Sequence, residues 1–369
     1  MKARILSVVG ARPNYMKVAP LQKAFERYSH WVEHLIVHTG QHYDAEMYDV
    51  FFADLDLPEP AVFLGVGPGT HAQQTARIML AFEPVCMQMR PRLVIVVGDV
   101  NSTLACTLTA VKLGIPVAHV EAGLRSFDRT MPEEINRIAT DAIADYFFVT
   151  EPSGVENLRR EGAPPERIFL VGNTMIDSLL LALPKARHHP IRDRFGLRPK
   201  EYVVVTLHRP SNVDHPEQLR MLLEILSEVA TWRTVVFPLH PRTQQAIDRF
   251  GLREYLCSLR ALPPLSYVEF LALLVEADFV MTDSGGIQEE TTYLGIPCLT
   301  LRTTTERPIT CQIGTNQLVP PQAENIRAAL DRLRRGERKH GQVPPLWDGH
   351  AAERIAEIIV RHCLRLPLE

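Results

Sequence analysis

Short runs of β-branched and other apolar residues alternate along this chain with longer segments of helical length. In the first half the runs read ILSVVG, HLIVHTG, LVIVVGD, PVAHVEAG, YFFVTE and IFLVGN, and many end at Gly, Asp or His. Strands that alternate with helices are typical of βαβ units, whose strands form a parallel sheet. The pattern therefore predicts an α/β protein.

The pattern pauses once, at a polar and basic stretch over residues 184–200 that we interpret as a linker. It restarts with YVVVTLHR, TVVFPLHP, DFVMTDSGG and CLTLRT. Two successive parallel sheets predict two Rossmann-like domains facing one another across a cleft, with ligands at the carboxyl ends of the strands. We predict an N-terminal domain over residues 1–172, a C-terminal domain over 173–354, and a C-terminal helix over 355–369 able to pack back on the first domain.

Composition narrows the kind of partner. The chain has 369 residues, 46% of them hydrophobic and 22% charged, which suits a globular protein of two domains. Its net charge is −3 with both signs interspersed, so we expect no nucleic-acid face and no membrane-surface patch. There is no apolar run of roughly 18 residues, no secretory signal pattern and no CxxC spacing among the six cysteines. These features predict a cytoplasmic protein that binds a small molecule.

Two acids follow consecutive predicted strands. Asp99 comes after LVIVV and Glu121 after PVAHV, and consecutive parallel strands are usually neighbours about 4.8 Å apart. The carboxylates would then emerge side by side, where repulsion and desolvation suit general acid/base catalysis. In the alternative interpretation, Asp99 makes an Asx turn and Glu121 pairs with Arg125 in a loop.

A third acid lies in the segment TMPEEINR. Thr130 followed three residues later by Glu133 has the form of a capping box, and Pro132 suits the first turn of a helix. Capping is a sufficient structural role for Glu133. The functional alternative is a third acid in the cleft.

In the second half, Ser284, Gly285 and Gly286 lie between a predicted strand and a predicted helix. Free backbone N–H groups and the helix dipole at such a position bind phosphate. Glu290 lies about one turn further along, where its carboxylate could bind a ribose diol. The alternative is a tight turn with an N-cap serine.

Other cationic or histidine side chains stand at predicted strand ends or near the SGG segment: Arg12, Lys17, His208, Arg209, His240 and Arg307. Cations on both sides of a cleft suit a diphosphate. A lone histidine is more often structural than catalytic, but His208 beside Arg209 at a strand end is a reasonable cleft residue. The chain has no HExxH, no tight His/Cys cluster and no GxGxxG after a strong strand, so we expect neither a metal nor a nicotinamide cofactor.

Six strings occur in order between about residue 8 and residue 320: GARPNYMK, TGQHYD, VVGDVNST, HVEAGLRSFDRTMPEEINR, TLHRPSNVD and TDSGGIQEETTYLGIPCLTLRTTTERP. Together they resemble the non-hydrolysing UDP-N-acetylglucosamine 2-epimerases. The resemblance implies a glycosyltransferase-B-type fold, a homodimer and no metal or redox cofactor. It also implies interconversion of UDP-N-acetylglucosamine and UDP-N-acetylmannosamine by elimination and re-addition of UDP through a 2-acetamidoglucal.

The resemblance also implies roles for residues at matching motif positions. The catalytic group would be Asp99, Glu121, Glu133 and His208. The residues that bind the UDP-sugar would be Arg12, Lys17, Arg209, Phe270, Ser284, Gly285, Gly286, Glu290 and Arg307.

The sequence departs from the family pattern near its second, allosteric site. Gln41, His42 and His240 would be remnants of that site, because the residues after His42 and Arg209 differ from those expected there. We therefore expect no activation by substrate. Other activities remain open: a 2-epimerase of a 2,3-diacetamido or uronic-acid UDP-sugar, a hydrolysing 2-epimerase that releases N-acetylmannosamine and UDP, a glycosyltransferase, or a non-catalytic nucleotide-sugar-binding protein.

Overall fold

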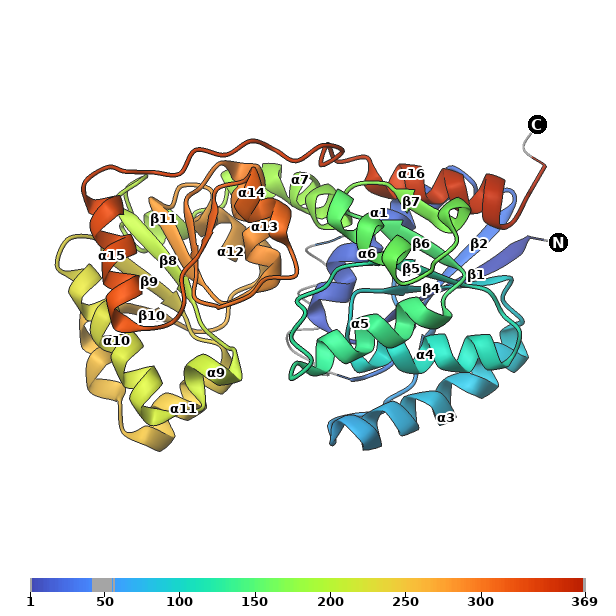
Figure 1. The fold of residues 1–369 in the computed structure, drawn as a ribbon, viewed down its shortest axis with the longest axis horizontal. Coiled ribbons are helices and arrows are strands. Elements are labelled where there is room, and N and C mark those ends of the chain that lie inside the picture. Colours follow the sequence, from blue (N-terminus) through green and yellow to red (C-terminus); the bar gives the residue numbers. More distant parts are fainter. Residues whose placement is uncertain (1, 42–54, 56, 368–369) are drawn as a thin grey trace. The chain divides into compact units, whose positions relative to one another are not determined.

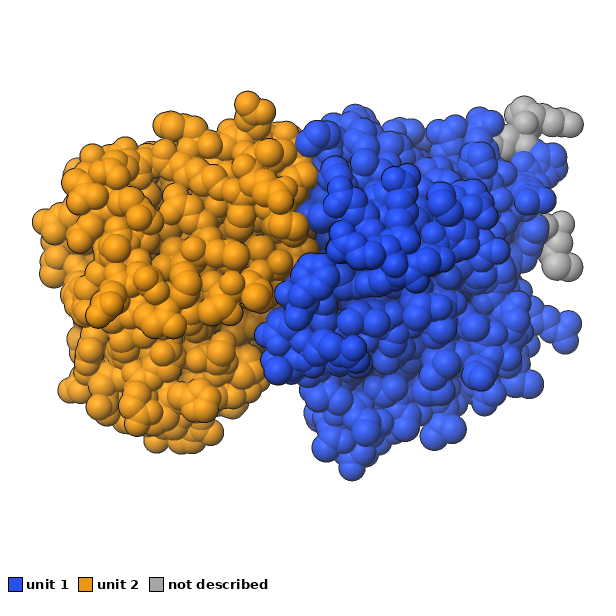
Figure 2. Space-filling view, in the orientation of Figure 1, with its two compact units in different colours: residues 1–181, 345–369 blue, residues 182–344 orange. Residues whose placement is uncertain are grey.

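The computed structural model describes residues 2–41, 55 and 57–367, which divide into two compact units (Figure 1). Unit 1 combines residues 1–181 with 345–369, and unit 2 comprises residues 182–344; Figure 2 colours them separately. The units thus divide within α7 (Thr174–Arg187) and after residue 344, whereas we expected domain limits at 172/173 and 354/355. Among the described helices, none has the length and apolarity needed to cross a membrane.

Unit 1 is built on a seven-stranded sheet in which every pairing is parallel. The order β3-β2-β1-β4-β5-β6-β7 places the topological switch point between β1 and β4. The strands are β1 (Ala3–Val9), β2 (Val32–His38), β3 (Val62–Phe63), β4 (Leu93–Val97), β5 (Val117–Val120), β6 (Tyr146–Val149) and β7 (Ile168–Leu170). The helices besides α7 are α1 (Arg12–Glu26), α3 (His71–Met89), α4 (Asn101–Lys112), α5 (Pro132–Ile143), α6 (Pro152–Arg160), η1 (Pro165–Arg167), α16 (Ala351–Ile358) and η3 (Ile359–Cys363).

Alternate residues of β1 point to opposite faces of this sheet, as the two-residue period of a strand requires. Ile5 belongs to a buried cluster with Leu21 of α1 and Ile355 of α16. Leu6 belongs to a second cluster with Phe82 of α3 and with residues of α4. Helices α1 and α16 therefore cover one face, and α3 and α4 cover the other (Figure 1).

The C-terminal segment is anchored to unit 1 by two buried polar contacts. The indole N–H of Trp347 donates to the carbonyl of Thr150 at 3.1 Å. The carboxyl group of Asp177 accepts the N–H groups of Ala351 and Ala352 at 3.2 and 2.7 Å, in the first turn of α16. Burial raises the pKa of Asp177 to about 6 although these amides favour its ionised form.

Unit 2 has a six-stranded parallel sheet in the order β10-β9-β8-β11-β12-β13, with its switch point between β8 and β11. The strands are β8 (Tyr202–Thr206), β9 (Thr234–Pro238), β10 (Arg260–Leu262), β11 (Phe279–Thr282), β12 (Cys298–Thr300) and β13 (Asn316–Leu318). The helices are α8 (Ile191–Arg194), α9 (Pro210–Val213), α10 (Pro216–Ala230), α11 (Pro241–Phe250), η2 (Arg253–Ser258), α12 (Tyr267–Leu274), α13 (Gly285–Leu294), α14 (Pro308–Gln312) and α15 (Ala323–Arg334).

One face of the unit 2 sheet packs on α10, α11 and α15. Val203 and Val205 of β8 lie in a single buried cluster with Leu222, Ile247 and Ile326 from those three helices. Each unit is therefore a parallel sheet flanked by helices, and the prediction of a two-domain α/β fold of the glycosyltransferase-B type is confirmed.

Candidate active site

The two acids predicted at the sheet edge of unit 1 follow adjacent strands, because β4 and β5 pair in parallel. Each carboxylate contacts a buried cation: Asp99 contacts Arg137, and Glu121 contacts Lys17. Opposite charges at this range offset the repulsion between the carboxylates. The alternative in which Glu121 pairs with Arg125 is wrong.

The backbone of Glu121 is strained. Its φ is +72°, a left-handed conformation that is uncommon for residues other than glycine. The N–H groups of Glu121 and Ala122 both donate to the carbonyl of Phe148, at 3.0 and 3.1 Å, which holds the turn in place. A Cβ at Gly98 would lie 2.8 Å from Nζ of Lys17, so the glycine leaves room for the amine that reaches Glu121. Strain of this kind is concentrated at functional sites.

A buried charge network lies beneath this turn. His119 contacts Asp141 through Nδ1 at 2.6 Å, and its Nε2 contacts the carbonyl of Gly98 at 2.8 Å. Arg125 binds the other oxygen of Asp141 at 2.7 Å and also binds Glu161 at 2.5 Å. Burial alone would raise the pKa of Asp141, but His119 and Arg125 lower it overall. His119 thus links β5, the strand that precedes Glu121, to the end of β4, and Asp141 ties this histidine to α5.

The capping box predicted for Thr130 and Glu133 is wrong. Helix α5 begins at Pro132, and its N-cap residue is Met131, which makes no side-chain capping bond. The hydroxyl of Thr130 donates to Asp128 at 2.6 Å instead. Glu133 lies half-buried in the first turn of α5.

The neighbouring residue Glu134 organises the preceding loop. Its buried carboxylate accepts the N–H groups of Ser126 and Phe127 at 3.0 and 2.9 Å. It also binds Arg137 at 2.7 Å, so one guanidinium joins Glu134 to Asp99. Burial would raise the pKa of Glu134, but the backbone donors and Arg137 lower it overall.

The loop after β1 is tied to the end of β4 by Asn14. Its side-chain oxygen accepts the N–H groups of Gly10 and Ala11 at 3.0 Å each, and its amide donates to the carbonyl of Val97 at 3.1 Å. This arrangement fixes the first turn of α1, which begins at Arg12. The side chain of Arg12 lies outside the described part of the structure.

Gln41 is buried against the first turn of α4. Its side-chain oxygen accepts the N–H and the hydroxyl of Ser102 at 2.9 and 2.6 Å, and Gln74 donates to its carbonyl at 3.1 Å. These contacts give Gln41 a structural role in unit 1. His42 lies outside the described residues, and the second-site role of both remains a prediction.

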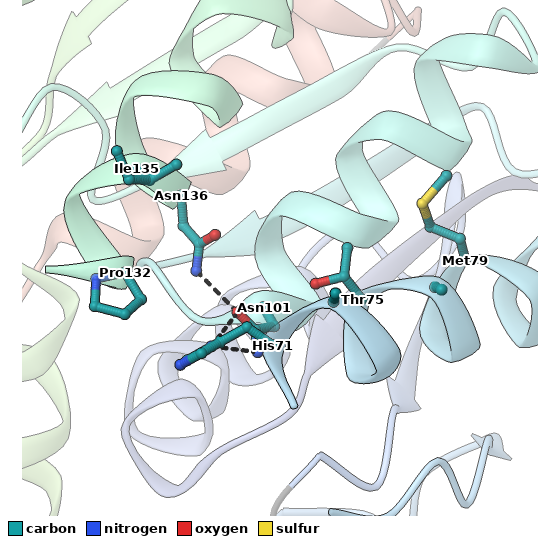
Figure 3. A pocket seen from close by; sticks show the side chains of 9 residues that line it. His71, Thr75, Met79, Asn101, Pro132, Ile135 and Asn136 are labelled. Carbon is teal, nitrogen blue, oxygen red and sulfur yellow. Dashed lines mark hydrogen bonds between the residues drawn. The ribbon is translucent and has the colours of Figure 1, made fainter. Parts of the chain in front are cut away.

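Figure 3 shows a pocket of about 470 Å³ in unit 1. Its walls come from α3, the start of α4 and the start of α5, and its lining residues are His71, Ala72, Thr75, Ala76, Met79, Asn101, Pro132, Ile135 and Asn136. Among the predicted site residues whose side chains the structure describes, none lines it. Asn136 in its wall nevertheless donates to the carbonyl of Asp99 at 2.9 Å and to Asn101 at 3.3 Å. The pocket thus adjoins the turn that carries Asp99.

In unit 2, His208 follows β8 and Asp283 follows β11, and these strands pair at the switch point. Nδ1 of His208 lies 2.8 Å from the carboxylate of Asp283, which is fully buried. The same carboxylate accepts the N–H groups of His208 and Arg209 and the side-chain amide of Asn212, at 2.9 to 3.1 Å. Burial alone would raise the pKa of Asp283, but His208 and the backbone donors lower it to about 2.

His240 lies beside His208, with ring centroids 5.4 Å apart. It is the N-cap residue of α11, and its Nδ1 accepts the N–H of Arg242 at 3.2 Å. Arg209 is the N-cap residue of α9 and is half-buried. The structure therefore brings His208, Arg209 and His240 together at one sheet edge of unit 2.

The SGG segment stands at the N-terminus of α13. Ser284 is its N-cap residue, but the hydroxyl makes no capping hydrogen bond. A Cβ at Gly285 would lie 2.7 Å from an oxygen of Glu306 and 2.8 Å from Nη1 of Arg307. Glycine is therefore needed here for Arg307 to approach the helix terminus.

Arg307 is held by two acids. It binds Glu306 at 2.5 Å and Glu289 at 2.8 Å, and the second oxygen of Glu306 binds Arg302 at 2.8 Å. All four side chains are at least nine-tenths buried. Two cations thus face two carboxylates, and the network fixes the position of Arg307 beside Gly285.

Glu290 is buried in α13 and accepts a hydrogen bond from the hydroxyl of Tyr267 at 3.0 Å. Burial raises the pKa of Glu290 to about 7, although Tyr267 favours the ionised form. Tyr267 and Phe270 both belong to α12, and Phe270 is half-buried. Phe270, predicted to contact the uracil, and Glu290, predicted to bind the ribose, therefore lie on α12 and α13. The hydrogen bond from Tyr267 to Glu290 connects these two helices.

The family model described as UDP-N-acetylglucosamine 2-epimerase matches residues 23–360 of the chain. The chain belongs to this epimerase family. It is 40% identical over 360 residues to a UDP-N-acetylglucosamine 2-epimerase of Methanocaldococcus jannaschii, covering 95% of this chain and 97% of the relative. It is also 40% identical over 365 residues to a UDP-2,3-diacetamido-2,3-dideoxy-D-glucuronate 2-epimerase of Pseudomonas aeruginosa, covering 97% and 99%.

Solved structures of epimerases share the fold. The structure of the M. jannaschii UDP-GlcNAc 2-epimerase in complex with UDP-GlcNAc and UDP has a TM-score of 0.89 at 40% identity, covering 96% of this chain and 99% of that chain. The Neisseria meningitidis UDP-GlcNAc 2-epimerase bound to UDP-GlcNAc also gives 0.89, at 27% identity, covering 97% of this chain and 100% of that chain.

Several residues that hold the candidate site residues in place were assigned no role from the sequence. They are Asn14, His119, Glu134, Arg137, Asp141, Asp283 and Glu306. The available signal was that six of them lie inside the quoted strings: Asn14 in GARPNYMK, His119, Glu134 and Arg137 in HVEAGLRSFDRTMPEEINR, and Asp283 and Glu306 in the string that begins TDSGG. Asp141 lies four residues beyond the fourth string. Within the described residues, no group of three or more His, Cys, Asp or Glu side chains could hold a metal ion.

Proposed function

We propose that this chain catalyses the reversible C2 epimerisation of UDP-N-acetylglucosamine to UDP-N-acetylmannosamine. Family membership supports the reaction type. The observation that carries the proposal is the pair of acids at the carboxyl ends of β4 and β5 in unit 1. Asp99 and Glu121 follow these adjacent strands, and each contacts a buried cation. Inverting a carbon requires removing a proton on one face and returning one on the other, so at least two acid/base groups are needed.

The proposed chemistry passes through a 2-acetamidoglucal. The C2 proton is unactivated by any neighbouring ketone, so its removal accompanies breakage of the C1–O bond, and UDP leaves with the electron pair. UDP then adds back at C1 while C2 takes a proton on the opposite face. We propose that Asp99, Glu121, Glu133 and His208 share these proton transfers. Water must be kept from the glycal, because its capture would amount to hydrolysis.

We propose that unit 2 binds UDP at the start of α13. The backbone N–H groups of this terminus, with Ser284, Gly285 and Gly286, would receive the diphosphate. Arg307 lies in a network of two arginines and two acids whose charges balance, so we propose Arg12 and Arg209 as further sources of the positive charge needed for UDP to depart. Lys17 is proposed as a third source, although its charge is already paired with that of Glu121.

Glu290 would bind the ribose diol, and Phe270 would contact the uracil. Both assignments follow from motif position, and the hydrogen bond between Tyr267 and Glu290 supports a shared binding surface.

We propose that the reaction uses no metal or redox cofactor, because epimerisation through elimination leaves the oxidation state of the sugar unchanged. A homodimer is proposed from the family resemblance. A cytoplasmic location is proposed because all six cysteines are free thiols, as is usual in a reducing compartment.

A second candidate substrate is a 2,3-diacetamido uronic-acid UDP-sugar. The supporting observation is that identity to the P. aeruginosa enzyme equals identity to the M. jannaschii enzyme, at 40% over nearly the whole chain. The same acids and UDP site would serve both substrates.

Incubation with a panel of UDP-sugars in heavy water tests both proposals. The physiological substrate should acquire deuterium at C2 in both epimers, without net accumulation of UDP. Release of free N-acetylmannosamine with UDP would indicate the hydrolysing activity instead. Asp99→Asn should abolish exchange, whereas Glu83→Gln, an exposed acid of unit 1, should leave it unchanged. Absence of exchange with every sugar would contradict the proposed reaction.

A further inference from the structure

Asp283, whose carboxylate contacts the ring of His208, has no role assigned from the sequence motifs. Asp283 is fully buried at the end of β11, and four donor groups converge on it: Nδ1 of His208, the backbone N–H groups of His208 and Arg209, and the side-chain amide of Asn212. A carboxylate surrounded by donors is ionised, and an ionised carboxylate can only accept hydrogen bonds. Asp283 therefore requires a proton on Nδ1 of His208.

The contact between Asp283 and Nδ1 determines which ring nitrogen of His208 is available for proton transfer. With the proton fixed on Nδ1, neutral His208 carries its lone pair on Nε2. About a third of the His208 side chain is exposed, whereas Asp283 is fully buried. Nε2 makes no hydrogen bond within the described part of the chain, so it remains available to accept a proton or, in the imidazolium form, to donate one.

His240 shows that position at a strand end does not set this tautomer. Its ring lies 5.4 Å from that of His208, yet its Nδ1 accepts the backbone N–H of Arg242. Nδ1 of His240 must therefore be unprotonated, and neutral His240 carries its proton on Nε2. Two neighbouring histidines thus hold opposite tautomers, because Nδ1 of His208 faces a carboxylate whereas Nδ1 of His240 accepts a backbone N–H.

We propose that Asp283 is a positioning residue for the epimerase reaction: it fixes the orientation and tautomer of His208 so that Nε2 faces the reacting groups. The inference rests on the proposed function, in which His208 is one of the proton-transfer residues. Asp283 itself need not touch the substrate, because it acts through the imidazole ring.

Asp283→Asn is the direct test, because the side-chain volume is kept and the amide oxygen can still accept the backbone N–H groups. The amide nitrogen would face Nδ1 as a donor and favour the Nε2-protonated tautomer. We expect kcat for C2 exchange to fall by about 100-fold or more while KM changes by less than about threefold.

Asn212→Ala is the matched control. It removes another donor to the same carboxylate, at 3.1 Å, without touching the ring of His208. We expect kcat to change by less than about threefold, provided that thermal unfolding shows a folded protein. Equal losses in the two variants would show that Asp283 only stabilises the loops, and would overturn the proposal.

A double-mutant cycle separates action through His208 from independent action. In a His208→Asn background, adding Asp283→Asn should cost less than about threefold further. A full additional loss would contradict the positioning role. If the wild-type enzyme shows no C2 exchange with any UDP-sugar, the proposed function is wrong. That result differs from a full additional loss in the double variant, which contradicts only the positioning role of Asp283.

Nitrogen-15 NMR of labelled histidines reads the tautomer without any substrate. Wild-type His208 should show a protonated Nδ1, and Asp283→Asn should shift the proton to Nε2. Asn212→Ala should retain the wild-type pattern. A wild-type spectrum with the proton on Nε2 at neutral charge would refute the inference even if the Asp283 variant could not be purified in folded form.

Discussion

Arg137 holds the carboxylate of Asp99 from a position 38 residues further along the chain. Its guanidinium is almost fully buried and also binds Glu134, so it cannot turn away without leaving a charge unpaired. The orientation of the Asp99 carboxylate therefore depends on Arg137 of α5 as much as on β4, the strand that precedes it.

Arg137→Lys should therefore lower C2 exchange although the charge is retained. A lysine amine cannot span two carboxylates as the planar guanidinium does. Loss of one charge-assisted hydrogen bond of about 2 kcal/mol corresponds to a fall of roughly 30-fold in kcat/KM. Steady-state exchange in heavy water measures it, and Arg129→Lys, at an exposed position, provides the control. Unchanged kcat/KM in Arg137→Lys would show that Asp99 does not depend on this contact.

Glu134→Gln should destabilise unit 1 while Glu133→Gln should not. The first change weakens the acceptor for two backbone N–H groups and removes the charge that faces Arg137. We expect a loss of about 1–3 kcal/mol in the free energy of unfolding, measured by urea denaturation. Glu133 lies one position earlier and half-buried, and we expect its variant to stay within about 0.5 kcal/mol of wild type. Equal stabilities of the two variants would contradict the loop-organising role of Glu134.

Glu290 should make unit 2 less stable as the pH rises. Its pKa in the folded protein is about 7, against an ordinary value of 4.5, so the folded state binds the extra proton between these pH values. The free energy of unfolding should then fall from about pH 4.5 to pH 7, by roughly 3 kcal/mol at most for this group. Glu290→Gln should remove this part of the pH dependence, whereas Glu324→Gln, at an exposed acid, should keep it. Parallel stability curves for wild type and Glu290→Gln would count against the buried neutral carboxyl group.

Gly285→Ala should weaken UDP binding. The added methyl group would meet Glu306 and Arg307 below 3 Å, and displacing Arg307 would disturb the helix terminus proposed to bind the diphosphate. We expect the Kd of UDP to rise about tenfold, equivalent to about 1.4 kcal/mol, by isothermal titration calorimetry. Gly69→Ala is the matched control, because the nearest atom to its new methyl group belongs to the side chain of Gln73. Wild-type affinity in Gly285→Ala would place the diphosphate elsewhere.

The sequence could predict the site residues that directly follow strands. Asp99, Glu121 and His208 follow apolar runs, and a parallel sheet brings the ends of such runs to one edge. Partners from distant segments could not be found in this way. Lys17 reaches Glu121 from α1, whereas the sequence suggested Arg125, four positions away. The predicted capping box was wrong because α5 begins one residue later than the spacing of Thr130 and Glu133 required, and a one-residue offset in a helix start changes the capping contacts.

Glu121 also shows that a strained backbone position can be held by the charge of its side chain. A residue at φ +72° costs about 1–2 kcal/mol more than glycine would at the same position. Glycine or asparagine here would relieve that cost but would leave the buried amine of Lys17 without this carboxylate, which costs about 3–5 kcal/mol. We therefore expect directed evolution that rewards only thermal tolerance to retain glutamate at this turn.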